Sequence, residues 1–154
     1  DYHLWEMDIG GQTYGLPIDE DWGTAPRKPA SRTRLRDVLA PGSTRIDYTY
    51  DFGDNWEHTL IVTDVRAGDV GTGYPRYIAG ERDCPPEDCG GISGFYEMLE
   101  AQADPDHPDH AEIHEWLDGY NPDELDVFPI EVALGRIAAR RNAAAKRIIK
   151  PAND

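Results

Sequence analysis

Two alternating segments joined by a short turn constrain the fold of this 154-residue chain more than any other feature. In RIDYTYDF (45–52) the apolar residues alternate with polar ones, and WEHTLIVTDV (56–65) continues the same two-residue period. This period is typical of β-strands with one buried face. The intervening GDN (53–55) consists of turn-forming residues, so the pattern predicts an antiparallel hairpin.

Other segments predict a second hairpin, a short helix, a further strand and a loop. HLWEMDIGGQTYG (3–15) alternates and turns at two glycines, and PRYIAG (75–80) indicates a short strand. The proline- and charge-rich stretch 16–31 has no periodicity and is predicted to be a surface loop. TRLRDVLAPG (33–42) predicts a short helix with Thr33 as its N-cap.

The second half of the chain has helical periodicity over residues 94–102, 110–120 and 129–150. The positions predicted to be buried are Phe95, Met98, Leu99, Ile113, Trp116, Leu117, Tyr120, Ile130, Val132, Leu134 and Ile137. Strands come first and helices last, which favours an α+β fold: an antiparallel sheet of hairpins packed against C-terminal helices. The length fits one domain over residues 1–150, followed by a short tail at 151–154.

The composition is that of a folded, acidic protein, with 39% hydrophobic residues and a net charge of −15. Such a charge disfavours nucleic-acid binding, because most of the surface repels phosphate. The exception is the last predicted helix, where six basic residues occur without an acid: Arg136, Arg140, Arg141, Lys146, Arg147 and Lys150. That helix either contacts nucleic acid or an acidic partner, or covers the chain's own acidic surface, which is the preferred interpretation.

The cysteine count and the hydropathy indicate a cytoplasmic protein with reduced thiols. Two cysteines are too few for a disulfide scaffold of this size. No apolar run approaches the roughly 20 residues that span a bilayer, and no signal-like segment opens the chain.

The stretch ERDCPPEDCGG (81–91) predicts a stiff, acidic loop. Two prolines fix the backbone, so Glu87 and Asp88 project in set directions, while acids near a helix N-terminus also have a purely structural use. Cys84 and Cys89 have a loose zinc spacing, but only His3 and His58 are plausible further ligands. A pair of buried thiols is the preferred interpretation.

The hairpin turn carries the second polar motif, YDFGDNWEH (50–58). Asp51, Asp54 and His58 suit a divalent metal or acid–base chemistry, although Asp and Asn are also ordinary turn residues and His58 suits a strand face. If the sheet pairs as expected, this motif meets Glu87 and Asp88 and forms an acidic cleft. Such a cleft can be a cation site, a hydrolytic centre or a docking surface for a basic partner.

Three segments in this order resemble the plasmid pRiA4b ORF-3-like family: YTYDFGDNWEH (48–58), CPPEDCGG (84–91) and EWL (115–117). The resemblance covers nearly the whole chain and implies an α+β fold and an association with plasmids or mobile elements, without an established activity. Some members are labelled transposon passenger proteins. A serine-recombinase activity is not supported, because Ser31, Ser43 and Ser93 lie in no arginine-rich setting.

Members of the family also usually carry a strand and a helix before the segment that HLWEM (3–7) resembles. This chain begins directly in a strand pattern and without a methionine. We therefore expect the native protein to continue upstream with a further strand and helix that cover the sheet.

Two functions follow as hypotheses. The first, which we favour because no complete catalytic constellation is visible, is a non-catalytic module that binds a protein partner or a small ligand. The second is a hydrolase that depends on a divalent metal, the one cofactor that the motifs suggest. The residues for either are Asp51, Asp54, His58, Glu87 and Asp88.

The charge generates the first testable prediction: the protein binds random duplex DNA weakly or not at all at about 0.15 M salt. The basic residues of the last helix offset the repulsion only locally, because the net charge of the chain is −15. Fluorescence anisotropy with a labelled duplex measures the affinity. A submicromolar dissociation constant at this salt concentration contradicts the prediction.

Overall fold

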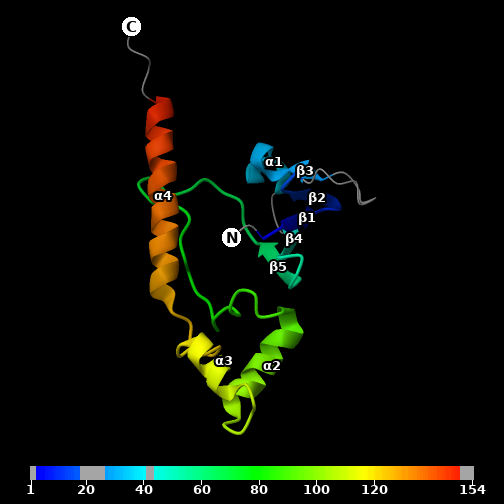
Figure 1. The fold of residues 1–154 in the computed structure, drawn as a ribbon. Helices are drawn as coiled ribbons and strands as arrows, with labels where there is room; N and C mark the ends of the chain where they lie inside the picture. Colours follow the sequence, from blue (N-terminus) through cyan, green and yellow to red (C-terminus); the bar gives the residue numbers. More distant parts are fainter. Residues whose placement is uncertain (1–2, 18–26, 41–43, 150–154) are drawn as a thin grey trace. The chain divides into compact units, whose positions relative to one another are not determined.

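The computed structural model describes residues 3–17, 27–40 and 44–149, the last six of these by their backbone alone (Figure 1). The strands are β1 (Trp5–Ile9), β2 (Gln12–Gly15), β3 (Lys28–Pro29), β4 (Thr44–Tyr50) and β5 (Trp56–Val62). The helices are α1 (Leu35–Val38), α2 (Gly91–Ala103), α3 (His110–Leu117) and α4 (Val127–Ile149), with a 3-10 turn at Ala30–Arg32. The predicted α+β fold is confirmed.

The chain divides into two compact units. One consists of Asp1–Arg66 with Pro86–Trp116, and the other of Ala67–Pro85 with Leu117–Asp154. The first unit contains the sheet together with α2 and most of α3, and the second contains α4. A single domain over residues 1–150 stays a prediction.

The sheet has the strand order β3-β2-β1-β4-β5. Both predicted hairpins are confirmed, because β1 pairs antiparallel with β2 and β4 pairs antiparallel with β5. β1 also pairs antiparallel with β4, which places the first hairpin beside the second. The edge strand β3 lies in the stretch predicted to be a loop and pairs parallel with β2, so the sheet is mixed. Residues 18–26 of that stretch lie outside the described residues.

The register separates an apolar and a polar face, because directly paired residues of neighbouring strands point to the same side. The apolar face is formed by Trp5, Met7, Ile9, Ile46, Tyr48, Tyr50, Trp56, His58 and Leu60. On the polar face, Arg45 donates hydrogen bonds to Asp47 and to Thr59. Ile46 is buried at 4% exposure, whereas Leu60 at the edge of the sheet is 39% exposed.

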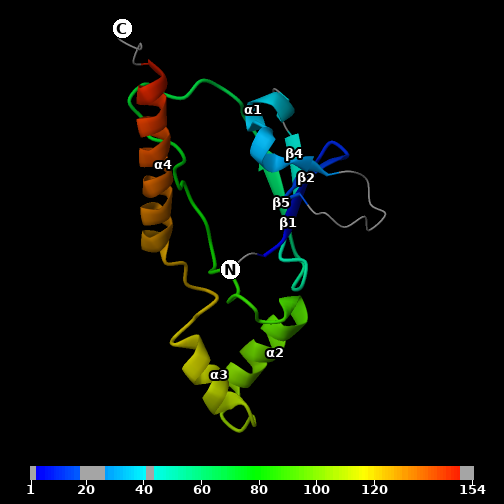
Figure 2. The same cartoon turned by 45° about the horizontal axis from the view of Figure 1, so that its top comes forward.

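Helices α2 and α3 are joined by a short connection and lie side by side at that end in both views (Figure 2). Nδ1 of His110 in α3 donates to the backbone oxygen of Ala101 in α2 at 2.9 Å. Met98, Ala101 and Leu117 are buried, which confirms two of the predicted core positions. The predictions for Trp116 and Ile137 are wrong, because these residues are 49% and 42% exposed. The side chain of Trp116 leaves α3 about 100° around the helix from that of Leu117.

Three local predictions change. The helix expected at 33–42 is the single turn α1, and Thr33 does not cap it, because its hydroxyl donates to the backbone oxygen of Pro29. No strand forms at 75–80. Helix α4 begins two residues earlier than predicted, because the Asp126 carboxylate accepts a hydrogen bond from Phe128 N in the first turn.

Among the described residues, no helix is both long enough and apolar enough to cross a membrane.

The burial of Ile46 generates a stability prediction. Ile46→Ala removes a side chain that is 4% exposed in a central strand and lowers the free energy of unfolding by about 3 kcal/mol. The matched control is Ile61→Ala on the other strand of the same hairpin, where the side chain is 53% exposed and the loss is below about 1 kcal/mol. Urea unfolding followed by tryptophan fluorescence measures both. Equal losses contradict the assigned faces of the sheet.

Candidate functional site

The turn between β4 and β5 holds the carboxylate of Asp51 in a fixed position. Asp51 and Asn55 both have positive φ angles, and Asn55 N donates to the backbone oxygen of Asp51. The side chain of Asp51 accepts a hydrogen bond from Gly53 N at 2.9 Å. This backbone N–H, followed by the nearby His3 imidazole, holds the pKa of Asp51 below its usual range despite burial of the residue. Asp51 is therefore a carboxylate at neutral pH.

The acidic loop before α2 docks against this turn. The Asp54 carboxylate accepts a hydrogen bond from Gly90 N at 3.2 Å. Gly91 has a φ of +69°, and a Cβ at this position would lie 2.5 Å from the backbone oxygen of Asp54. Glycine is thus required at 91 both by the left-handed backbone and by the close approach. The two motifs meet at one end of the β4–β5 hairpin.

Tyr50 and Trp56 add two further contacts at this end of the hairpin. The Tyr50 hydroxyl donates to the Glu87 carboxylate at 3.0 Å. Burial, together with this carboxylate, raises the pKa of Tyr50, so the phenol stays neutral and acts as a donor. The Trp56 ring meets the Phe95 ring of α2 edge to face at 6.4 Å.

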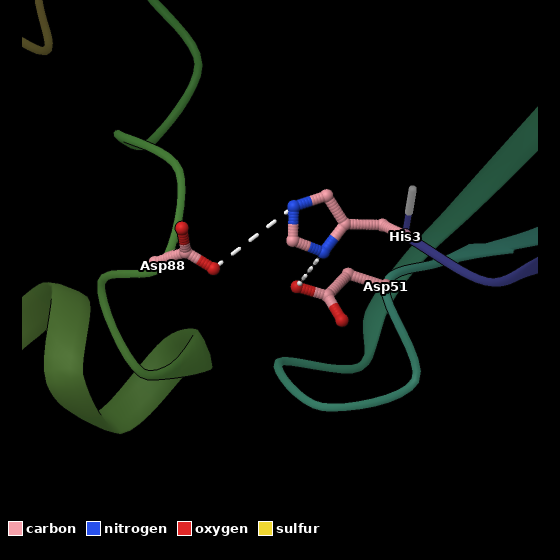
Figure 3. A group of neighbouring side chains, drawn as sticks. All are labelled: His3, Asp51 and Asp88. Atoms are coloured by element: carbon pink, nitrogen blue, oxygen red, sulfur yellow. Dashed lines mark ion pairs between the residues drawn. The ribbon is translucent and has the colours of Figure 1, made fainter. Parts of the chain in front are cut away.

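His3, which stands two residues before the start of β1, lies between the two acidic segments (Figure 3). Its Nδ1 is 3.0 Å from Oδ2 of Asp51, and its Nε2 is 3.7 Å from Glu87 and 3.9 Å from Asp88. The side chains of His3 and Asp51 are largely covered, at 18% and 12% exposure, whereas that of Asp88 is 78% exposed. Two members of the cluster are therefore held in place, and the third lies at the rim.

The structure brings together four of the five residues predicted for the acidic cleft: Asp51, Asp54, Glu87 and Asp88. His58 instead directs Nδ1 to the backbone oxygen of Trp56 at 3.1 Å and packs its ring against Tyr48 at 5.2 Å. Among the described residues, one group of potential ligands has its atoms within 4.8 Å of one another, and it consists of His3, Asp51 and Asp88. His58 is not part of it.

The cysteines do not belong to this group either. Cys84 is exposed and Cys89 is half-buried, so the predicted pair of buried thiols is wrong. Burial, followed by the charge of Asp54, raises the pKa of the Cys89 thiol. Among the described residues, no group of clustered ligand atoms contains a cysteine, which disfavours the cysteine-based zinc hypothesis.

The sequence suggested His3 only as an additional ligand for the cysteines. The alternation does place His3 on the same face of the first strand as Trp5. It becomes part of the cluster because β1 pairs with β4, which puts Trp5 opposite Tyr50 and His3 beside the end of that strand. The His3 and Tyr50 rings are 5.6 Å apart. Strand order is a tertiary property, so the local pattern could not specify it.

The close approach at Gly91 generates a testable prediction. Gly90→Ala introduces only the strain of a left-handed alanine, about 1–2 kcal/mol, because the nearest atom to its Cβ is 3.6 Å away. Gly91→Ala adds a collision with the Asp54 backbone and lowers the free energy of unfolding by more than about 3 kcal/mol. Urea unfolding measures both.

Hydrogen exchange at the residue 90 amide, which donates to Asp54, provides a second readout. The exchange rate rises in Gly91→Ala if the loop detaches from the turn. Equal destabilisation by the two variants, with unchanged exchange at residue 90, contradicts the described contact.

Comparisons with known proteins agree with this architecture. The chain is 36% identical over 147 residues to the uncharacterized protein y4hQ of Sinorhizobium fredii (strain NBRC 101917 / NGR234), covering 94% of this chain and 75% of that protein. A crystal structure of MM3350 from Methanosarcina mazei Go1, a protein of unknown function, matches with a TM-score of 0.66 and 31% identity. That match covers 82% of this chain and 71% of MM3350.

The family model described as "Plasmid pRiA4b ORF-3-like protein" matches residues 1–128, a range that includes both acidic motifs, His3 and the α2–α3 pair. The names of these relatives state no activity. On this match and on the relative at 36% identity, the chain belongs to the plasmid pRiA4b ORF-3-like family.

Proposed function

We propose that the protein is a binding module whose acidic cluster holds one divalent metal ion. The observation that carries this proposal is the set of ligand atoms on His3, Asp51 and Asp88, which all lie within 4.8 Å of one another. Opposite ligands of one ion with bonds of about 2.1 Å lie about 4.2 Å apart, so small side-chain movements bring all three into coordination. One imidazole and two carboxylates favour zinc or another first-row transition metal over calcium.

The exposure of the three side chains supports the proposal further. His3 and Asp51 are covered and oriented before any ion arrives, which lowers the entropic cost of binding. Asp88 lies on the loop and is open to solvent, so an ion can enter from that side. The depressed pKa of Asp51 keeps one ligand ionised at neutral pH.

The same three residues can instead form an internal ion cluster, with a protonated His3 between carboxylates. The two states differ in what stabilises the protein. A bound metal stabilises the protein more as its free concentration rises, with a logarithmic dependence, whereas the stability of an internal ion cluster does not depend on the metal concentration. Metal binding also displaces the proton, so the apparent affinity falls as the pH is lowered.

The alternative function is a hydrolase that depends on the same metal. Three protein ligands leave coordination positions for water, as in catalytic zinc sites. The observation that favours this alternative is the 65% exposed Glu87 carboxylate next to the His3 ring, where it can accept a proton from a bound water. Turnover of a generic phosphate ester by the metal-loaded protein, lost in Glu87→Gln, would select the hydrolase.

The metal proposal predicts that zinc or manganese binds the chelator-treated protein at about pH 7.5 and raises its melting temperature. Asp51→Asn and His3→Gln weaken binding by at least about tenfold, because each removes a ligand. The control Asp64→Asn makes the same charge change at an exposed carboxylate that pairs with Arg66, and leaves binding unchanged. Titration calorimetry measures the affinities.

Equal binding by Asp51→Asn and the wild type would locate any metal elsewhere. No binding of either metal to the wild type would leave the cluster as an internal ion pair. The cytoplasmic location and the association with plasmids or mobile elements stay predictions.

A further inference from the structure

A groove of about 520 Å³ lies between α2 and α3, and neither His3 nor Asp51 lines it. Its lining includes five acidic residues: Asp88, Glu97, Glu100, Asp109 and Glu112. Five of twelve lining residues are thus Asp or Glu, compared with 30 of 154 in the whole chain. The groove is enriched in negative charge about twofold even for this acidic protein.

No fixed positive charge offsets these acids within the groove. Its lining contains no lysine or arginine, and none occurs in the sequence between Arg82 and Arg136. His107 also lines the groove, and its Nδ1 accepts a hydrogen bond from Asp109 N at 3.1 Å and lies 4.0 Å from the Asp109 carboxylate.

The groove also has an apolar floor and an aromatic wall. Met98 is 4% exposed and forms part of the lining, and Ile113 lies beside it. Trp116 lines the groove with 49% of its surface exposed. A tryptophan that the helical pattern places among buried positions, yet which faces solvent beside carboxylates, is characteristic of a contact surface.

These features match the side chains of arginine and lysine. Both have an apolar stem and a cationic end, and the stem covers apolar surface while the charge reaches polar groups. A guanidinium stacks on tryptophan and forms paired hydrogen bonds with a carboxylate. Nucleic acid and anionic membranes are repelled by the same five acids.

We propose that the groove between α2 and α3 docks an arginine- and lysine-bearing peptide segment of a partner protein. Trp116 and Met98 contact the apolar stem of one basic side chain of the peptide. The carboxylates of Glu97, Glu100 and Glu112 pair with the cationic end of that side chain and with those of neighbouring basic residues of the peptide. The site shares only Asp88 with the metal cluster, and it requires no metal.

Fluorescence anisotropy with the full chain tests this proposal. The probe is a labelled peptide of about twelve residues in which arginine and leucine alternate, and the buffer contains a metal chelator and about 0.15 M salt. The combined variant Glu97→Gln, Glu100→Gln and Glu112→Gln weakens binding at least about tenfold. The control variant Glu57→Gln, Glu115→Gln and Glu124→Gln makes the same charge change at exposed residues outside the groove and changes affinity less than about twofold.

Trp116→Ala leaves the net charge of the protein unchanged, so it tests the aromatic contact separately from the charge. It weakens peptide binding about fivefold. Asp51→Asn leaves peptide binding intact, which separates this test from that of the metal site. Circular dichroism verifies that each variant is folded.

Three results would overturn the proposal. Equal losses of peptide affinity in the two triple-glutamate variants would show that net charge alone explains the binding. If spermine displaces the labelled peptide as effectively as unlabelled peptide does, and Trp116→Ala does not change the affinity, the groove is a site for small polycations. Salt-dependent self-association of the wild type, abolished by the groove variant, would assign the groove to the basic helix of a second copy.

Discussion

The contact between the Asp51–Asn55 turn and the start of α2 is the constraint on which the sheet-bearing unit depends. Gly90 N donates to the Asp54 carboxylate, and Gly91 lies so close to the Asp54 backbone that a Cβ would not fit. This short segment joins the β4–β5 hairpin to the α2–α3 pair, and the ring contact of Trp56 with Phe95 lies beside it. It also determines where the loop presents its acids to His3.

The chemistry of the cluster follows from how each carboxylate at this junction is satisfied. Asp51 and Asp54 accept hydrogen bonds from backbone N–H groups, which stabilises their negative charge. Glu87 receives one hydrogen bond from Tyr50, and Asp88 remains exposed. Like charges so close together repel one another, and a cation between them relieves that repulsion. A protonated His3 or a bound metal can each supply it.

The two acidic surfaces of this unit differ in what surrounds the carboxylates. At the hairpin end, an imidazole and a nearly covered Asp51 make a compact set of ligand atoms that suits a small ion. Between α2 and α3, carboxylates surround an exposed tryptophan and an apolar floor, which suits a long side chain with a terminal charge. Ligand size, rather than net charge, therefore distinguishes the two proposals.

The sequence by itself determined both hairpins, the three main helices and the acidity of two motifs, because a two- or 3.6-residue period and turn residues are local properties. It predicted Leu117 as buried but also Trp116, because a helical period does not reveal how much of α3 finds a packing partner. Only the tertiary structure decided that β1 lies beside β4, which brings His3 to Asp51. His58 instead lies opposite Tyr48 within the β4–β5 hairpin. Strand order and the docking of α2 on the turn depend on contacts between distant residues, and no local pattern encodes them.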